Sequence, residues 1–228
     1  MIASADFSSP RKNKRMKSQK FENTLSTQSV KRLPLYLRIL SEMRDAGDEY
    51  ASSAVIAEQL NFDPIMVRKD LAGCGVTGVP RKGFLLTELC RAVERILGCN
   101  VTCEAIMVGV GKLGAALLGH SGFEQYGIKI VVAFDLKPSE VNRVGIPVYS
   151  MQKLEEVVAK TKAKIGILTV PADVAQSVAD RMIAAGIKGI WNFTPVHLKI
   201  PEGVIVKREN LATSLIVLSH RMRSAKLI

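Results

Sequence analysis

The stretch that decides the fold of this chain is Val108-Gly109-Val110-Gly111-Lys112-Leu113-Gly114. It follows the apolar run 105–108, precedes a segment suited to a helix, and its glycines keep the Gly-x-Gly-x-x-Gly spacing. In that setting the first glycine permits a tight turn and the second lets a pyrophosphate approach the backbone. The third glycine lets the helix pack closely on the strand. The stretch therefore predicts a loop that binds the phosphates of a dinucleotide.

The sequence after this loop predicts a parallel sheet covered by helices on both faces, because short apolar segments alternate with helical ones. The expected strands are 105–108, 130–134, 147–149, 165–170, 189–193 and 204–206, and the expected helices are 112–118, 152–160 and 172–185. Asp135 follows the second strand, where a carboxylate can accept hydrogen bonds from ribose hydroxyls. We therefore predict a Rossmann-type domain that binds NAD(H). The basic Lys137 nearby leaves NADP as the alternative cofactor.

The sequence before the loop predicts a helix-turn-helix. Apolar residues from Leu33 to Met43 recur at three- and four-residue steps, which indicates an amphipathic helix. Ser52 can cap a second helix that ends near Leu60, and Asp63 can cap a third that begins at Pro64. Two short helices around a tight turn are typical of DNA-binding proteins.

The third of these helices carries the residues expected to contact double-stranded DNA. Val67, Leu71, Cys74 and Pro64 fall on one side and are expected to face the core. Met66, Arg68 and Lys69 are expected to face outward, where the two cations suit guanine edges and phosphates. A solvated charged face is the alternative interpretation.

A wing is expected to follow, since segment 75–84 has three glycines and a proline with β-branched residues between them. Arg81 and Lys82 at the tip of this hairpin would reach the DNA backbone. A helix over 86–97, with Leu89, Val93 and Ile96 inward, is expected to close the domain.

Composition supports a polyanionic partner. The 228-residue chain has a net charge of +11, and residues 1–32 carry eight Lys or Arg against two acidic residues. Weak apolar periodicity predicts that this tail is disordered, either as a solubilising segment or as an arm that contacts phosphates. The four cysteines lack a Cys-x-x-Cys pair and are expected to be buried, reduced thiols of a cytosolic protein without a metal site. No apolar run is long enough to cross a membrane.

Catalytic residues are not evident. Three histidines are present, and the sequence has no nucleophile elbow or metal-ligand cluster. This pattern favours a binding module over an enzyme. Two alternatives stay open: an NAD-dependent oxidoreductase with an accessory N-terminal domain, and a CoA-binding module, since ligase-type CoA domains share this kind of sheet and glycine-rich loop.

From about Leu33 to Ser219 the chain resembles the Rex family of bacterial redox-sensing transcriptional repressors. The resemblance is carried by 67–71, 83–84, 108–114, 133–135, 170–172 and above all by 186–195. It implies a homodimer that binds palindromic operator DNA and releases it when NADH rises relative to NAD. It also implies that Val170 and Pro171 contribute to the cofactor site, that Phe193 lies by the nicotinamide, and that the last helix packs in the partner subunit.

The sequence departs from the family pattern at three positions: Phe84 and His120 stand where tyrosine is common, and Lys137 stands where a second acid is common. The expected organisation has four parts. They are a basic disordered tail (1–30), a winged-helix DNA-binding domain (31–98), a Rossmann NAD(H)-binding domain (101–208) and a C-terminal dimerisation helix, swapped between subunits (209–228).

Overall fold

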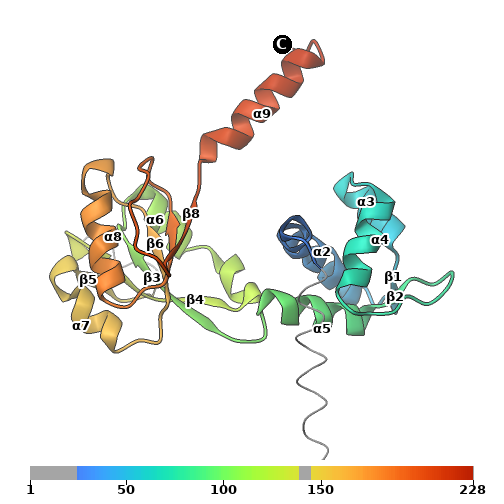
Figure 1. Cartoon of the computed structure of the whole chain (residues 1–228), viewed down its shortest axis with the longest axis horizontal. Coiled ribbons are helices and arrows are strands. Elements are labelled where there is room, and N and C mark those ends of the chain that lie inside the picture. The colour runs from blue at the N-terminus through green and yellow to red at the C-terminus, as the bar shows by residue number, and fades with distance from the viewer. Residues whose placement is uncertain (1–24, 139–144, 228) are drawn as a thin grey trace, which may run out of the picture. The chain divides into compact units, whose positions relative to one another are not determined.

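The computed structural model describes residues 25–138 and 145–227. The chain divides between Asn100 and Val101 into two compact units (Figure 1). The predicted disorder of residues 1–24 lies outside the described residues.

Residues 25–100, the described part of the first unit, contain four helices and a two-stranded sheet: α2 (Thr27–Asp45), α3 (Ser53–Leu60), α4 (Pro64–Gly73), α5 (Leu86–Leu97), β1 (Tyr50–Ala51) and β2 (Phe84–Leu85). The two predicted caps are confirmed. The Ser52 hydroxyl accepts the Ala54 N–H at 3.3 Å, and the Asp63 carboxylate accepts the Met66 N–H at 2.9 Å. Asn61 adopts a left-handed conformation and ends α3, which makes room for the turn before α4.

Helix α2 begins earlier than the sequence predicts. Ser26 caps it by accepting the Ser29 N–H at 3.0 Å, and the helix continues through Pro34. Residues 27–30 are therefore helical, and their assignment to the disordered tail is wrong. Ser29 is buried while Met43 is only half-buried, so the buried face of α2 lies nearer its start than the sequence pattern suggested.

The wing is smaller than predicted. Residues of segment 75–84 pair with one another at a single β-bridge, between Val79 and Gly83. The Gly83 N–H donates to the Val79 carbonyl at 3.0 Å. Phe84 and Leu85 pair instead with β1, in antiparallel register. The predicted hairpin is thus a tight turn whose second arm is anchored to the segment before α3.

The second unit contains a six-stranded parallel sheet, as predicted. Its strands are β3 (Cys103–Val108), β4 (Ile128–Asp135), β5 (Val148–Ser150), β6 (Ile165–Leu168), β7 (Gly189–Asn192) and β8 (Ile205–Arg208). Their spatial order is β5-β4-β3-β6-β7-β8. The order reverses between β3 and β6, and open sheets of this kind bind ligands in the crevice outside the carboxyl ends of the strands at such a reversal.

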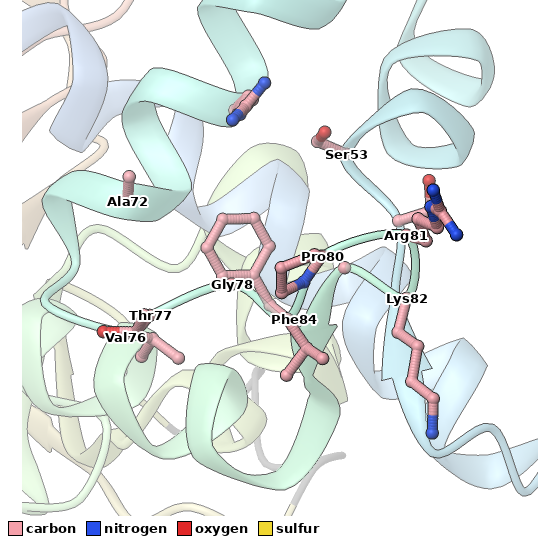
Figure 2. Close-up of a pocket in the computed structure, with 13 residues that line it drawn as sticks. Ser53, Ala72, Val76, Thr77, Gly78, Pro80, Arg81, Lys82 and Phe84 are labelled. Carbon is pink, nitrogen blue, oxygen red and sulfur yellow. The ribbon is translucent and has the colours of Figure 1, made fainter.

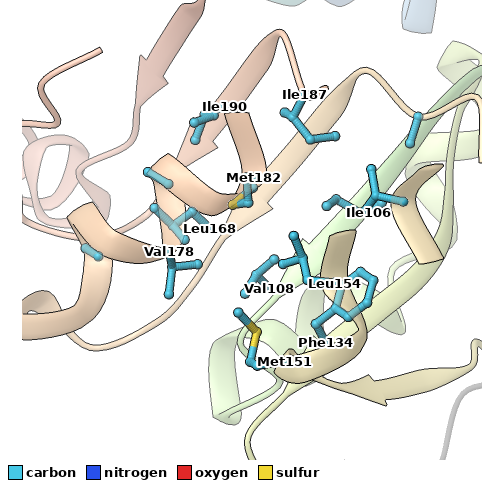
Figure 3. Packing of buried hydrophobic residues seen from close by; sticks show 14 of the residues in the cluster. Ile106, Val108, Phe134, Met151, Leu154, Leu168, Val178, Met182, Ile187 and Ile190 are labelled. Atoms are coloured by element: carbon cyan, nitrogen blue, oxygen red, sulfur yellow. The ribbon is translucent and has the colours of Figure 1, made fainter. Parts of the chain in front are cut away.

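Both faces of the sheet carry buried apolar side chains. One face packs against the 3-10 turn η3 (Met151–Lys153), α7 (Leu154–Ala159) and α8 (Ala175–Ala184). Figure 3 shows Val178 and Met182 of α8 facing the strand residues Leu168 and Ile190. The other face packs against α6 (Lys112–Leu118) and the 3-10 helix η1 (Ser121–Tyr126). Predicted helix 172–185 begins with a 3-10 turn, η4 (Ala172–Val174).

The last helix, α9 (Leu211–Ser224), buries none of its residues. Leu211, Leu215 and Ile216 expose about two-thirds of their surface, at 67%, 68% and 65%. In the described ranges, no helix combines the length and apolar character needed to span a bilayer.

Candidate functional site

The outward face of α4 carries the predicted DNA-contacting residues. Arg68 and Lys69 are exposed, and Met66 is half-buried. Val67, Leu71 and Cys74 are buried, as predicted, but Pro64 is exposed rather than inward. The burial of one helical face therefore presents Arg68 and Lys69 to solvent.

A buried carboxylate fixes the orientation of α4. Asp70, the residue after Lys69, accepts two hydrogen bonds from the Arg32 guanidinium, at 2.7 Å from Nε and 2.9 Å from Nη2. The Tyr36 hydroxyl donates a third at 2.8 Å. The side chain of Asp70 is 5% exposed and that of Arg32 21%. Because three donors on α2 converge on this carboxylate, α4 is held in one rotational setting about its axis.

The pKa values of these groups follow from the cluster. Burial raises the pKa of the Asp70 carboxyl, but the hydrogen bonds from Arg32, Tyr36 and Ser29 and the charge of Arg32 outweigh that effect and hold it below its ordinary value. Burial and the hydrogen bond to Asp70 raise the pKa of Tyr36. At neutral pH the cluster is therefore a carboxylate held by a guanidinium and a neutral phenol.

A cleft of about 790 Å³ lies between α4 and the turn 78–83. Arg68, Arg81 and Lys82 line it, whereas Met66 and Lys69 do not. In Figure 2, Pro80, Arg81 and Lys82 follow one another along the turn, and Ala72 projects from α4. Three of the five predicted DNA-contacting residues thus share one concave, basic surface.

The geometry of the turn depends on residues 81–83. Arg81 adopts a left-handed conformation with φ of 65°, and the ammonium of Lys82 lies 4.8 Å from the centre of the Tyr50 ring. Gly83 has φ of 104°, and a methyl group added there would collide with the Ala51 carbonyl oxygen. The turn therefore approaches β1 too closely for any side chain at residue 83.

The glycine-rich loop lies at the carboxyl end of β3, where the strand order reverses. Gly109 has φ of 93°, and an added methyl group would lie 2.7 Å from the Thr169 carbonyl oxygen. At Gly114 an added methyl group would collide with the Gly109 carbonyl oxygen, whereas at Gly111 it would meet nothing within 4 Å. The first and third glycines are thus required by packing, and the second borders space that a ligand can occupy.

The carboxylate of Asp135 bridges the end of β4 and this loop. It accepts the Val110 N–H at 2.7 Å and the Lys137 N–H at 3.0 Å. Each carboxylate oxygen can accept a further hydrogen bond, so both are available to ribose hydroxyls. In the rest of the predicted loop, Val110 is buried, Leu113 half-buried and Lys112 exposed.

The remaining predicted cofactor residues follow the neighbouring strands. Val170 and Phe193, expected at the ends of their strands, come after β6 and β7, and Pro171 follows Val170. The Phe193 N–H donates to the Leu168 carbonyl at 3.0 Å. Its ring lies 4.5 Å from that of Trp191, in a group of aromatic rings that includes Phe123 and His120.

Sequence reasoning missed several residues. Arg32 was counted with the tail, and Asp70 was not assigned to a face, although its position three after Val67 and four before Cys74 is a signal for burial. Thr169, whose hydroxyl donates to the Gly109 carbonyl at 2.6 Å, carries no signal of its own in the sequence.

The four cysteines all lie in the described part of the chain and form no disulfide. Cys74 and Cys90 are buried, as expected, but Cys99 and Cys103 are only half-buried. Burial raises the pKa of the Cys74 thiol to about 12. No cluster of His, Cys, Asp or Glu suited to a metal ion occurs among the residues that the structure describes.

Two protein families match the chain. The family described as "Putative DNA-binding protein N-terminus" matches residues 24–72, and the "CoA binding domain" family matches residues 101–196. The chain is 41% identical over 203 residues to the redox-sensing transcriptional repressor Rex of Treponema denticola. This alignment covers 87% of this chain and 95% of that protein. It is also 41% identical over 198 residues to Rex of Porphyromonas gingivalis, covering 86% of this chain and 91% of that one.

The chain is also similar to solved structures of one protein, RSP. RSP in complex with NAD+ and operator DNA superposes with a TM-score of 0.79 at 34% identity, over 89% of this chain and 94% of that one. RSP, a Rex-family repressor, in complex with NADH superposes with a TM-score of 0.77 at 33% identity, over 89% and 96%.

Proposed function

Because the chain belongs to the Rex family of redox-sensing transcriptional repressors, we propose that it binds palindromic operator DNA as a homodimer and releases this DNA when NADH rises relative to NAD. The observation that carries the proposal is the likeness, over 89% of the chain, to a repressor solved with both NAD+ and operator DNA. The comparisons support a regulator and not the alternative of an oxidoreductase. A cytoplasmic location is part of the proposal, since operator DNA lies there in bacteria.

In this proposal α4 enters the major groove and the turn 78–83 lies against the backbone. The proposed contacts come from Met66, Arg68, Lys69, Arg81 and Lys82. The exposure of the four cations and the concave surface shared by three of them support this assignment. Arginine donates two hydrogen bonds to guanine, and lysine pairs with phosphate, so the cluster supplies both base contacts and positioning contacts.

The dinucleotide would bind at the carboxyl ends of β3, β4, β6 and β7. The proposed contacts are Gly109, Val110, Gly111, Lys112, Leu113, Gly114, Asp135, Val170, Pro171 and Phe193. The open space beside Gly111 and the carboxylate at the end of β4 support a dinucleotide with free ribose hydroxyls. Asp135 would repel a 2′-phosphate, so we expect NADH to bind more tightly than NADPH.

Helix α9 and an apolar cleft on the sheet support the homodimer. The apolar residues of α9 are exposed, and a separate apolar cleft of about 250 Å³ over β6, β7 and β8 is lined by Trp191, Ile205 and their neighbours. An isolated helix of 14 residues is marginally stable in water, so α9 needs a surface to pack on. The division into a tail, a DNA-binding domain, a Rossmann domain (101–208) and a dimerisation helix (209–228) belongs to the same proposal, with all of α2 (Thr27–Asp45) placed in the DNA-binding domain.

The experiment is a calorimetric titration of NADH into the free protein and into protein saturated with operator DNA. If NADH weakens DNA binding about a hundredfold, the coupling free energy is roughly 2.7 kcal/mol, and linkage requires DNA to weaken NADH binding by the same factor. Equal NADH affinities in the two titrations would contradict the proposed switch. Tighter binding of NADPH than of NADH would contradict the role of Asp135 and favour Lys137 as a 2′-phosphate contact.

A further inference from the structure

We propose that Thr169 is a positioning residue of the dinucleotide site, whose hydroxyl holds the phosphate loop in its binding conformation. The inference rests on the proposed NAD(H)-binding function of that loop, and it adds a residue that contacts the loop. Thr169 directly follows β6, the strand beside β3 where the strand order reverses.

The hydroxyl of Thr169 has one clear acceptor. Its Oγ1 lies 2.6 Å from the Gly109 carbonyl oxygen and 3.2 Å from that of Val108. The Val108 carbonyl already accepts the Thr169 backbone N–H at 2.9 Å, as a continuation of the sheet. The single hydroxyl proton therefore goes to the carbonyl of Gly109.

This hydrogen bond and that of Asp135 hold the same peptide group. The Gly109 carbonyl and the Val110 N–H belong to one planar peptide unit. Thr169 donates to the oxygen of this unit from the β6 side, and Asp135 accepts from its nitrogen, at 2.7 Å, from the β4 side. Two side chains on opposite sides of β3 thus fix the orientation of one peptide plane at the start of the loop.

Such a restraint matters because Gly109 is conformationally permissive. Its φ of 93° lies in a region that glycine enters freely, and neighbouring regions are equally open to it. Without partners at both ends, the peptide plane after Gly109 can rotate and redirect the N–H groups that follow it. The space between the Thr169 hydroxyl and the start of α6 is also closely filled, since a methyl group added at Gly114 would lie 3.0 Å from Thr169 Oγ1.

The hydroxyl should therefore contribute to ligand affinity by preorganisation. A protein that lacks it would have to order the loop when the ligand binds. We expect the affinities for NADH and NAD to fall together, by about tenfold each, because both ligands carry the same pyrophosphate. The affinity of the ligand-free protein for operator DNA should not change.

The test compares Thr169→Val, which keeps the β-branched shape without the hydroxyl, with Thr169→Ser, which keeps the hydroxyl. The matched control is Thr161→Val, because Thr161 donates to the Val158 carbonyl at 2.9 Å, away from the loop. NADH and NAD are titrated calorimetrically into each full-length protein, and operator affinity is measured without dinucleotide. We expect weakened NADH binding in Thr169→Val, and affinity within about twofold of the unmodified protein in Thr169→Ser and Thr161→Val.

The outcomes separate this inference from the proposed function. If the unmodified protein does not bind NADH, the proposed function fails. If it binds NADH and Thr169→Val binds equally well, the role of Thr169 is refuted while the proposed function stands. Equal weakening in the Val and Ser variants would also refute it, because side-chain shape rather than the hydroxyl would then matter. If Thr169→Val does not fold, Thr169→Ala replaces it in the same comparison.

Discussion

Replacing Arg32 by Met should loosen α4, because the substitution leaves the Asp70 carboxylate buried with Tyr36 as its main donor. Removing one partner of a buried ion pair typically costs about 3–5 kcal/mol. The Arg32 side chain is 21% exposed, so solvent already screens the pair, and the Tyr36 hydroxyl still donates. We therefore expect a cost of about 2–3 kcal/mol, which raises the opening equilibrium of α4 roughly 30- to 150-fold.

Amide hydrogen exchange at pH 7 is the assay, since it reports the opening of α4 separately from the rest of the chain. The control is Arg38→Met on the same helix. Arg38 pairs with Glu42 at 3.9 Å, and both side chains are more than half exposed, so its loss should cost less than about 1 kcal/mol. Replacing Arg32 and Asp70 together by apolar residues should cost less than Arg32→Met alone, because no buried charge is then left unpaired.

The effect of Arg32→Met should depend on pH with a defined sign. In the unmodified protein the pKa of Asp70 is lowered, so its contribution to stability is complete above the unfolded-state pKa of about 3.9 and is lost as the pH falls through the folded-state pKa. In the variant, burial without the guanidinium raises the pKa of Asp70, so acid relieves the destabilisation. The gap in urea midpoint between the two proteins should narrow from pH 7 towards pH 4. A gap that is absent at pH 7, or constant over this range, would refute the reasoning.

Three further predictions concern the proposed sites. Arg68→Ala should weaken operator binding by about 1–3 kcal/mol in a fluorescence-anisotropy titration, whereas Arg91→Ala on the exposed face of α5 should not; equal losses would contradict the assignment. Gly83→Ala should distort the turn and lower both thermal stability and DNA affinity, while Gly78→Ala, whose added methyl group would lie 3.5 Å from its nearest neighbour, should be tolerated. Gly111→Ala should leave the thermal midpoint unchanged, because its methyl group meets no protein atom within 4 Å, but should weaken NADH binding in calorimetry. Unchanged NADH binding would show that the ligand does not approach the loop there.

The sequence was sufficient for features that depend on neighbours along the chain. The caps at Ser52 and Asp63, the Gly-x-Gly-x-x-Gly loop and the Ile- and Val-rich strands are local patterns, and the structure has them where they were expected. The parallel sheet follows from the alternation of strands and helices, because parallel neighbours need a crossover between them.

The features that sequence reasoning missed depend on distant partners. Asp70 and Arg32 are 38 residues apart, and Thr169 and Gly109 are 60 apart, so no local pattern connects them. From the sequence alone, Asp70 beside Arg68 and Lys69 is as compatible with an exposed, solvated face as with burial, because its partner Arg32 is distant in the chain. The start of α2 was missed for another reason. Basic residues on both sides of Ser26 give this stretch the composition of a disordered tail, and composition alone does not reveal that Ser26 caps a helix.

The residues proposed to bind the phosphates and riboses of the dinucleotide cannot by themselves make the protein sense redox state. NAD+ and NADH carry the same phosphates and ribose hydroxyls, so Asp135 and the loop that Thr169 holds offer equal contacts to both. The two ligands differ at the nicotinamide, which is a cation in one and neutral in the other. Phe193 and Trp191 form an apolar, aromatic surface with two opposing effects on a cation. Removing the cation from water costs free energy, whereas the ring faces attract it. Small changes at this surface therefore shift the relative affinities for NAD+ and NADH. A ligand that binds both DNA-affinity states equally shifts neither. In the proposed site, where Phe193 lies by the nicotinamide, selectivity between NAD+ and NADH therefore arises at the end of β7 and not at the loop.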